Sequence, residues 1–525
     1  MMKKVIKKLL AALLAVAMVC AMAIPAFAYN TEENLNGTHG YSAFQIFKGV
    51  ISKDNQTLSN VEWGQNIPHY EDFLAKLKED PTLGNLFNEA DDVQDVLAVI
   101  SKWHDSDNDS IAFARFVCNY LYSDANADPK PVITDHTGSI NIPESGYYLI
   151  VDTTYFNLGD FYHAYNSFFL LNVPQAPYVV LVNHKVVKPY VEKEVYDNQD
   201  GTNEAGFGSS ADHAINEEFQ FQLTATLPAS ENNGRAYDYY DEYAVLFNDT
   251  LSKGITYDRL DSVVIESNGI PYDITNDTSK YEVDDSRLES DHYFVVGIPD
   301  VKTCVPDLNK GATITVTYTA HLNENAVVNG STDNKNKVQL QYSNNPRNSA
   351  YWGFTPESEV CVYTYQLNNT KYHDEDKPGN ELEGAGFRLY SDEACEHEVE
   401  LYKEGDFYYP ITTGKTAVEM KSAANGQFNV KGLDAGTYYL KETTPPAGYS
   451  ACDKTPIVIS ATHDEHNVNL SGESNLNNKI INKKAGGITL PSTGGIGTTL
   501  FYVIGGGLMV AAAVLLITKK RMENK

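Results

Sequence analysis

The chain has 525 residues and a formal net charge of −30 at pH 7. An acidic balance of this size excludes a protein that holds nucleic acid or anionic lipid by charge alone. The length exceeds what one hydrophobic core accommodates, so we expect about three folded domains.

Residues 1–28 carry the pattern of a secretory signal peptide. Four lysines precede an apolar stretch, which ends at Pro25 and at the small-residue sequence Ala26-Phe27-Ala28. We therefore expect export of the chain and cleavage before Tyr29. The alternative is a buried or membrane-spanning N-terminal helix, which the proline and the cleavage site disfavour.

Residues 29–187 are predicted to form an N-terminal β-sandwich domain with a helical insert. GYSAFQIFKGVI alternates as a strand does, helical spacing follows between residues 70 and 122, and strands return at SGYYLIVDTTYF and YVVLVNHKVV. HDSDNDS, residues 104–110, offers three aspartates but lacks the glycine and glutamate of a calcium loop. We expect a solvated acidic loop there and no metal.

Residues 188–357 and 358–484 are predicted to form two further β-sandwich modules in series. Short alternating stretches such as EFQFQLTATLP and ATITVTYTAHL recur with turn residues between them, without a long helix. The predicted fold class is therefore mainly β, with sandwich domains in tandem.

Each of these two modules begins with a strand that carries a lysine and ends with a strand that closes on an asparagine. The pairs are Lys193 with Asn344 and Lys371 with Asn482. First and last strands of a sandwich can be neighbours, so these side chains can meet in the core, where burial lowers the lysine pKa and leaves a nucleophilic amine. A neutral carboxylic acid beside them can polarise the amide, and the product is a side-chain amide with release of ammonia. The alternatives are a solvated lysine and a turn asparagine.

YYLKETTPPAGY, residues 438–449, matches the pilin E-box pattern Y-x-L-x-E-x-x-x-P-x-G-Y. Together with LEGAGFRLY and QYSNNP, it makes the chain resemble the Ig-like, collagen-adhesin-type modules of Gram-positive pilins, which form intramolecular isopeptide bonds. The resemblance implies Glu442 as the acid of the last module, and LFNDTLSKGITY implies Asp249 as the acid of the middle one. We expect no such set in the first domain, although Lys48 and Asn172 are available.

The cysteines outside the signal are few. The resemblance to SpaA-type shaft pilins implies a disulfide between Cys395 and Cys452, which export permits. Cys118 lies on a helical apolar face and is expected to be a buried thiol. A pair between Cys304 and Cys361 across the second domain boundary is a further expectation.

Residues 485–525 combine a short polar motif, an apolar segment and a basic tail. The apolar segment, residues 500–517, has the length of a membrane helix, and the basic tail is expected on the inner side. The arrangement resembles the LPXTG cell-wall sorting signal of Gram-positive surface proteins. It implies that a sortase cleaves between Thr493 and Gly494 and passes the Thr493 acyl group to an amine. The motif is Leu490, Pro491, Ser492, Thr493 and Gly494.

The first domain boundary carries a candidate for that amine. APYVVLVNHKVVKPYVEKEV resembles the segment where shaft pilins have V-x-V-Y-P-K, and it places Lys185 at the intersubunit position. Asn183 and His184 stand where the family has Tyr-Pro, so Lys188 stays open as the alternative acceptor.

The resemblance as a whole implies a major (backbone) pilin, a covalent polymer of identical subunits. A class C-type sortase would build it, and a housekeeping sortase would attach it to peptidoglycan. The alternative is a wall-anchored adhesin, or a minor basal or tip pilin, that binds a host surface ligand. A surface hydrolase is disfavoured because His104, His184 and His463 lie in separate segments without a nucleophile elbow or metal-type spacing. We expect neither an enzyme nor a cofactor.

Overall fold

A computed structural model describes most of the chain between residues 40 and 485. The described ranges are 40–51, 58–104, 107–122, 130–135, 139–153, 168–181, 188–198, 205–228, 236–328, 334–346, 352–464, 466–471 and 474–485. The predicted signal peptide, the Lys185 acceptor and the sorting motif lie outside these ranges. Among the helices within them, none combines the length and hydropathy needed to cross a membrane.

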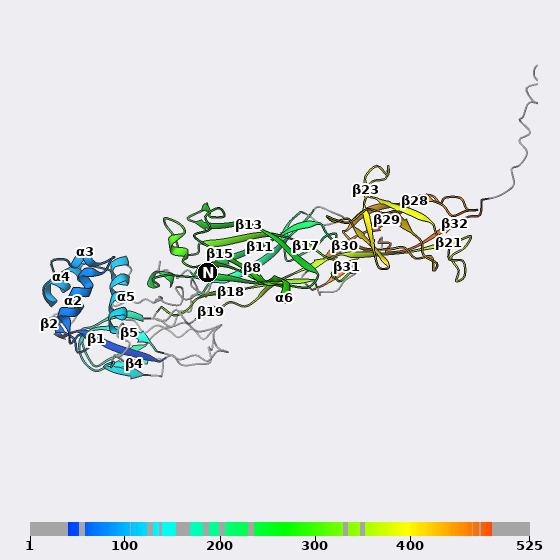
Figure 1. Cartoon of the computed structure of the whole chain (residues 1–525). Coiled ribbons are helices and arrows are strands. Elements are labelled where there is room, and N and C mark those ends of the chain that lie inside the picture. The colour runs from blue at the N-terminus through cyan, green and yellow to red at the C-terminus, as the bar shows by residue number, and fades with distance from the viewer. Residues whose placement is uncertain are drawn as a thin grey trace, which may run out of the picture.

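The first domain is a five-stranded antiparallel sheet covered on both faces. The sheet has the order β2-β1-β5-β6, and β3 also pairs with β1. Four helices lie between β2 and β3 in the chain and pack on one face, as the predicted insert requires (Figure 1). The elements are β1 (Tyr41–Ile51), β2 (Leu58–Trp63), α2 (Tyr70–Glu79), α3 (Gly84–Phe87), α4 (Val93–Ile100), α5 (Asn108–Tyr122), β3 (Ile133–Asp135), β5 (Gly146–Asp152) and β6 (Phe168–Val173).

Strand β1 shows why both faces of this sheet are covered. Phe44 and Ile46 point to the helices, whereas Tyr41 and Ala43 belong to a separate core on the other face. Successive side chains of a strand alternate between faces, so two apolar faces require two covering layers. The second layer is the small sheet formed by β4 (Ser139–Ile142) and β7 (Tyr178–Leu181).

The middle module is a sandwich of two sheets. One has the order β14-β13-β17-β11-β8-β9 and the other β10-β20-β18-β12-β16-β15, with β19 (Trp352–Phe354) beside β18. Its remaining elements are the short helices η2 (Ala236–Tyr239), α6 (Leu288–Asp291) and η3 (Val301–Thr303). The first sheet contains β8 (Tyr190–Asp197), β9 (Gly206–Gly208), β11 (Glu218–Thr226), β13 (Ile255–Ser267), β14 (Ile270–Asp273) and β17 (Thr313–Leu322). The second contains β10 (Ser210–Asp212), β12 (Val245–Leu251), β15 (Glu282–Arg287), β16 (Tyr293–Ile298), β18 (Lys335–Ser343) and β20 (Ser358–Tyr363).

The last module repeats the two-sheet plan. Its sheets have the orders β24-β25-β27-β21-β32 and β23-β22-β28-β29, with β26 (Met420–Lys421) beside β22 and a separate β30–β31 hairpin. The first sheet contains β21 (Tyr365–His373), β24 (Leu401–Glu404), β25 (Phe407–Pro410), β27 (Asn429–Leu433) and β32 (Asn477–Asn482). The other strands are β22 (Gly386–Tyr390), β23 (Glu398–Val399), β28 (Gly436–Thr444), β29 (Thr455–Ile459), β30 (Ala461–His463) and β31 (Val468–Leu470). The mainly β class and the tandem sandwich plan are thus confirmed.

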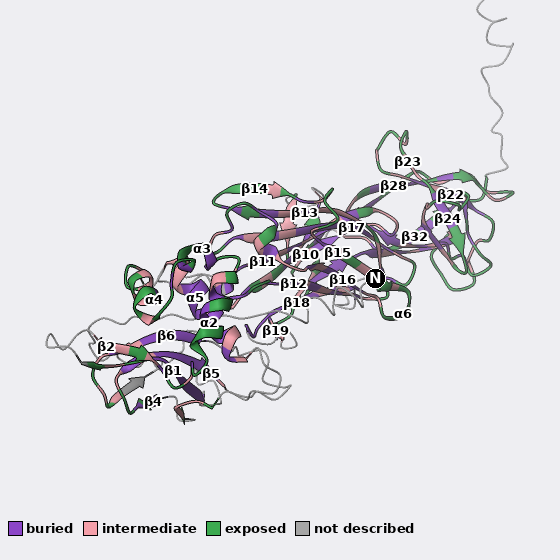
Figure 2. Ribbon diagram, turned by 60° about the vertical axis from the view of Figure 1, so that its left-hand side comes forward, coloured by how far each residue is buried: buried purple, intermediate pink, exposed green. Residues whose placement is uncertain are grey.

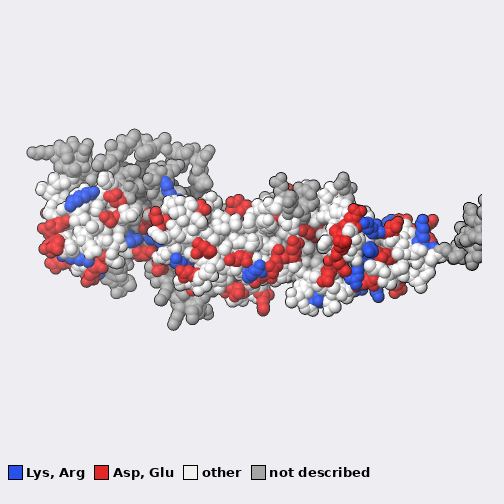
Figure 3. All heavy atoms as spheres, turned by 90° about the horizontal axis from the view of Figure 1, so that it is seen from above, with Lys and Arg blue, Asp and Glu red and all other residues white. Residues whose placement is uncertain are grey.

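The three parts follow one another along an elongated molecule (Figure 1). Buried residues concentrate between the layers of each part (Figure 2). Strand β20 belongs to the middle sandwich, whereas we expected residues 358–363 in the last module. The chain enters the last module's sheet at Tyr365. Acidic side chains are spread along the face in Figure 3, with basic ones among them.

Candidate functional site: two buried lysine–acid–asparagine sets

The last module brings together the three residues predicted for it. Lys371 Nζ donates to Asn482 Oδ1 at 2.6 Å, and Asn482 Nδ2 donates to Glu442 Oε1 at 2.7 Å. Lys371 Nζ also lies 3.7 Å from Glu442 Oε1, and both side chains are fully buried. The amine, the amide and the acid are therefore in mutual contact inside the core.

Strand alternation explains how these polar residues come to face inward. In β21 the residues Tyr365, Leu367, Asn369 and Lys371 share the buried face. In β32 the buried face holds Asn478, Ile480 and Asn482. The two strands are parallel neighbours: Lys371 is paired with Ile480, and Asn482 is the next inward residue of β32, within reach of the long lysine side chain.

The surroundings of Lys371 disfavour its charged form. Burial lowers the pKa of its amine. The neighbouring thiol of Cys452 and the carboxyl group of Glu442 raise this pKa and so offset part of the decrease. The ring of Phe387 lies 5.2 Å from Nζ, and the Cys452 backbone N–H donates to the second Glu442 oxygen at 2.7 Å. This backbone bond orients Glu442 with its other oxygen toward the amide.

The middle module brings Lys193 to the predicted acid. Lys193 Nζ donates to Asp249 Oδ2 and lies 3.0 Å from the Tyr318 hydroxyl, which donates to Asp249 Oδ1 at 3.2 Å. Lys193 comes from β8 in one sheet and Asp249 from β12 in the other, so the contact crosses the sandwich. Tyr318, on β17, was not predicted; its inward place in the alternating stretch TITVTYTAHL is the signal that points to it.

The asparagine of this set is Asn336, and the expectation for Asn344 is wrong. Asn336 Nδ2 donates to the same Tyr318 hydroxyl that Lys193 contacts, and its buried Oδ1 has no hydrogen-bond partner among the described residues. Asn336 lies at the start of β18, where Val338 is paired with Asp249. Asn344 follows the far end of β18, about 25 Å along the strand at roughly 3.3 Å per residue. Its position is set by strand length, which places it away from Lys193.

The electrostatics of the middle set resemble those of the last. Burial lowers the pKa of Lys193 to about 8, against the opposing effect of Asp249. Burial also raises the pKa of Asp249, although Lys193 and Tyr318 act the other way. The Phe221 ring lies 5.0 Å from Nζ. A low-dielectric core thus moves both groups toward their neutral forms.

The predicted disulfides are absent from the structure. Cys395 and Cys452 are free thiols: Cys452 Sγ lies 3.6 Å from Lys371 Nζ, whereas Cys395 lies in the turn after β22 with its thiol toward the Glu393 carbonyl. Cys304 and Cys361 do not form the expected pair, because they belong to separate hydrophobic cores. Cys118 is a buried thiol, as expected.

The first domain shows no such set among the residues considered for it. Lys48 is about half exposed and pairs with Glu62 at 2.8 Å, and Asn172 lies on β6, two strands away. At the boundary of the first and middle parts, Lys188 lies two residues before the start of β8 at Tyr190.

This geometry and fold define a class: an extended structural protein of tandem β-sandwich modules with amine, acid and amide groups inside the cores. Residues 368–475 match the SpaA family model, a prealbumin-like fold domain, and residues 228–346 match the Cna-B-like domain of Gram-positive pilin backbone subunit 2. Residues 482–524 match the LPXTG cell wall anchor motif. The chain is thus a structural pilus subunit of the Gram-positive backbone type, secreted and anchored to the cell wall through a sortase. Proteins of these families are structural components and not enzymes.

Solved structures of major pilins have similar folds at low identity. The T6 backbone pilin of Streptococcus pyogenes is 15% identical, with 87% of this chain and 98% of that chain covered and a TM-score of 0.48. Full-length SpaD of Corynebacterium diphtheriae is 18% identical, with 69% and 87% covered and a TM-score of 0.41. No curated protein is similar enough to this chain to count as a match. The class assignment rests on the domain and anchor matches.

Proposed function

We propose that the chain is the shaft subunit of a covalently polymerised pilus, in which folding closes one amide bond in each of the last two modules. The bonds join Lys371 to Asn482 and Lys193 to Asn336. The observation that carries the proposal is the pair of buried lysine–acid–asparagine sets. In each set the lysine amine contacts an acid. The asparagine amide donates to that acid in the last module and to the tyrosine beside the acid in the middle module.

The chemistry balances as an exchange of amines. The neutral lysine Nζ attacks the asparagine Cγ, the Cγ–Nδ2 bond breaks, and ammonia leaves while an Nζ–Cγ amide forms. The lysine loses one proton and the departing nitrogen gains one, so a neighbouring acid that accepts and donates a proton suffices. Glu442 contacts Asn482 Nδ2 directly. Asp249 reaches Asn336 through the Tyr318 hydroxyl. Each bond forms once per molecule, so the reaction is maturation by the chain itself.

Polymerisation is the second part of the proposal. A class C-type sortase joins Thr493 of one subunit to Lys185 of the next, and a housekeeping sortase transfers the finished polymer to peptidoglycan. The anchor match and the pilin domain matches support sortase attachment and assembly with other subunits. Lys185 lies just before the middle module, and Lys188 is the other lysine within reach.

The experiment is electrophoresis of cell-wall extracts after boiling in detergent. A ladder of high-mass species that disappears in Lys185→Ala and persists in Lys188→Ala is expected. A ladder that survives Lys185→Ala and is lost in Lys188→Ala would move the acceptor to Lys188. A single wall-bound species in the wild type would contradict the shaft role and favour the adhesin or minor pilin.

A further inference from the structure

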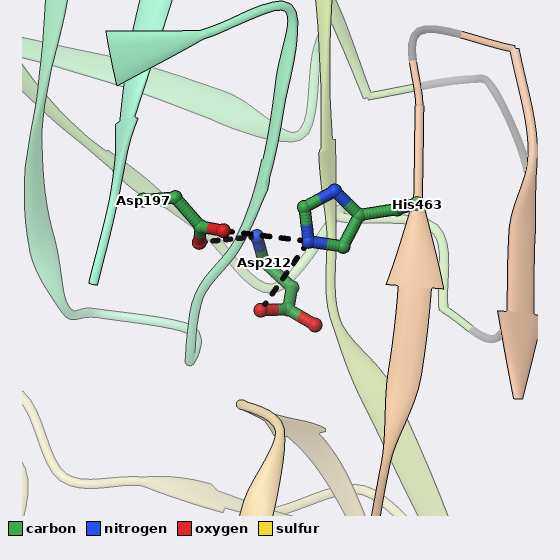
Figure 4. Close-up of side chains that lie close together, drawn as sticks. All are labelled: Asp197, Asp212 and His463. Atoms are coloured by element: carbon green, nitrogen blue, oxygen red, sulfur yellow. Dashed lines mark hydrogen bonds and ion pairs between the residues drawn. The ribbon is translucent and has the colours of Figure 1, made fainter. Parts of the chain in front are cut away.

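The junction of the middle and last modules holds a buried cluster outside both isopeptide sets. Asp197 ends β8, Asp212 ends β10, and His463 ends β30 of the last module (Figure 4). His463 Nε2 lies 3.5 Å from Asp197 Oδ2 and 3.8 Å from Asp212 Oδ1. All three side chains are buried: His463 exposes 5% of its side-chain surface, Asp197 9% and Asp212 0%. Three ligand-type atoms thus converge on one point between modules.

Each of the three groups is oriented by a bond from its other polar atom. Ser210 Oγ lies 2.9 Å from His463 Nδ1, and Tyr365 OH donates to Asp212 Oδ2 at 2.6 Å. The Asp212 backbone N–H donates to Asp197 Oδ1 at 3.2 Å. These bonds leave Nε2 and one oxygen of each aspartate facing the common point. Outer contacts of this kind are what fix ligand orientation in protein metal sites.

An independent observation shows that the cluster needs a further partner. Among the residues that the structure describes, none gives Asp212 Oδ1 a hydrogen bond, although the atom is buried. A buried carboxylate oxygen without a donor is costly, and a second carboxylate beside it increases the cost. The distances from His463 Nε2 exceed those of a hydrogen bond, so the imidazole alone does not satisfy it.

We propose that Asp197, Asp212 and His463 bind a divalent transition metal ion, with Zn²⁺ as the first candidate. One imidazole nitrogen and two carboxylate oxygens form a ligand set that Zn²⁺ accepts at about 2.1 Å, with water in the fourth position. Tetrahedral ligands at about 2.1 Å are separated by about 3.4 Å. The nitrogen–oxygen distances of 3.5 and 3.8 Å are close to that spacing, so small shifts complete the site.

The ion would add a tie between two modules that already meet through several hydrogen bonds, such as those from Asn198 Nδ2 to Asp434 and from Asn216 Nδ2 to the Pro410 carbonyl. Asp197 and Asp212 belong to the middle sandwich, whereas His463 belongs to the β30–β31 hairpin of the last module. The hairpin also accepts a hydrogen bond from Tyr363 OH to the Asp464 carbonyl at 2.9 Å, and Ile215 N–H donates to the Gly432 carbonyl at 3.0 Å. The metal therefore stiffens the junction, independently of the isopeptide chemistry.

Isothermal titration of the full exported chain with Zn²⁺, after removal of metals with EDTA, tests the site. We expect one tight ion per chain, retained in His466→Gln on the same hairpin and lost in His463→Gln. Ser210→Ala leaves all three ligands in place and should weaken binding by about 10- to 100-fold, as removal of an outer-shell partner typically does. The melting temperatures of the metal-free variants show whether each one is folded.

Two results would overturn the proposal. Equal Zn²⁺ binding by the wild type and His463→Gln would place the ion elsewhere, for example at the neighbouring group His213, Glu217 and Asp434. No binding by the folded wild type would leave the three side chains as a polar cluster without a metal.

Discussion

Asn336 and Asn344 lie at opposite ends of β18, and the isopeptide chemistry distinguishes them. Asn336 shares the Tyr318 hydroxyl with Lys193, whereas Asn344 lies beyond Ser343, the last residue of the strand. The wild-type chain should therefore have an intact mass two ammonia molecules below that expected from its sequence. Asn336→Ala should lack only one, and the matched control Asn344→Ala should still lack both. Intact-mass spectrometry of the purified chain gives the answer.

The reverse pattern would show that the middle module uses another pair. If Asn344→Ala regains an ammonia and Asn336→Ala does not, the strand register around Asp249 differs from the one described. A wild-type mass without any deficit would remove both bonds.

The buried amine of Lys193 predicts how stability depends on pH when its bond cannot form. In Asn336→Ala, Lys193 keeps a folded-state pKa of about 8, below its ordinary 10.5. Between these values the unfolded chain binds more protons, so the free energy of unfolding should rise as pH increases from about 8 to 10.5. The pKa of Asp249 is raised in the folded chain, so at lower pH this group makes the free energy of unfolding decrease as pH increases. Urea unfolding at about pH 7.5, 9 and 10, from just below this window to near its upper end, measures the effect.

The matched control is the double variant Asn336→Ala, Lys193→Met, in which the titrating group is replaced by an apolar chain of similar length. Its stability should lack this rise with pH. A rise of equal size in both variants would assign the effect to other groups and contradict a neutral Lys193.

At the scale of elements, β32 is an edge strand whose pairing partner among the described strands is β21, in parallel. An edge strand with one neighbour is the first to open, and a covalent tie between Lys371 and Asn482 would prevent it. Lys371→Met removes the amine and therefore the bond, whereas Glu442 keeps its hydrogen bonds from Asn482 and from the Cys452 backbone. We expect faster hydrogen exchange of the β32 amides and earlier proteolysis at the C-terminal end of the module.

Lys479→Met on the same pair of strands is the control. Lys479 is exposed, and its ion pair with Asp376, at 3.0 Å, is screened by solvent and contributes little to stability. Exchange rates in β32 should then resemble the wild type. Equal acceleration in the two variants would mean that the strand is held by ordinary pairing.

The same strands show what could be predicted from the sequence. The alternation in β21 and β32 and the E-box around Glu442 were sufficient to identify Lys371, Glu442 and Asn482, whose contacts the structure now describes. In β18 both asparagines have the inward phase, so alternation could not choose between them. Only the register against β12 separates the two, and register is set by long-range pairing.

At the scale of the whole molecule, the order of domains could be predicted but the contacts between them could not. His463 showed no metal-type spacing in the sequence because its partners, Asp197 and Asp212, lie more than two hundred positions before it. They meet because Tyr363, which pairs with Asp212 at the end of β20, also donates a hydrogen bond to the Asp464 carbonyl next to His463. The disulfides failed as predictions for a similar reason, since cysteine positions do not reveal which core each thiol enters.

The placement of the two bonds predicts how the subunit carries tension. In the proposed polymer, force enters at Lys185 and leaves at Thr493, so the first domain precedes the loaded segment. The bonds shield the chain between residues 193 and 336 and between residues 371 and 482 from extension. The loaded segments are residues 185–193, 336–371 and 482–493, and the second of these contains β18, β19 and β20 of the middle sandwich. Single-molecule pulling between these two points should therefore show no event that extends residues 193–336 or residues 371–482.

Removing one bond should expose one module at a time. Asn336→Ala should add a single unfolding event. It releases residues 193–336, which at roughly 3.5 Å per residue is a gain in contour length of about 500 Å, less the folded length of the module. Glu442→Ala should instead release the 111-residue separation of Lys371 and Asn482, or about 390 Å on the same basis. Asn344→Ala should behave as the wild type. Wild-type molecules that lengthen by either amount would show that the load passes through unbonded sandwiches, because a covalent tie cannot be extended without breaking.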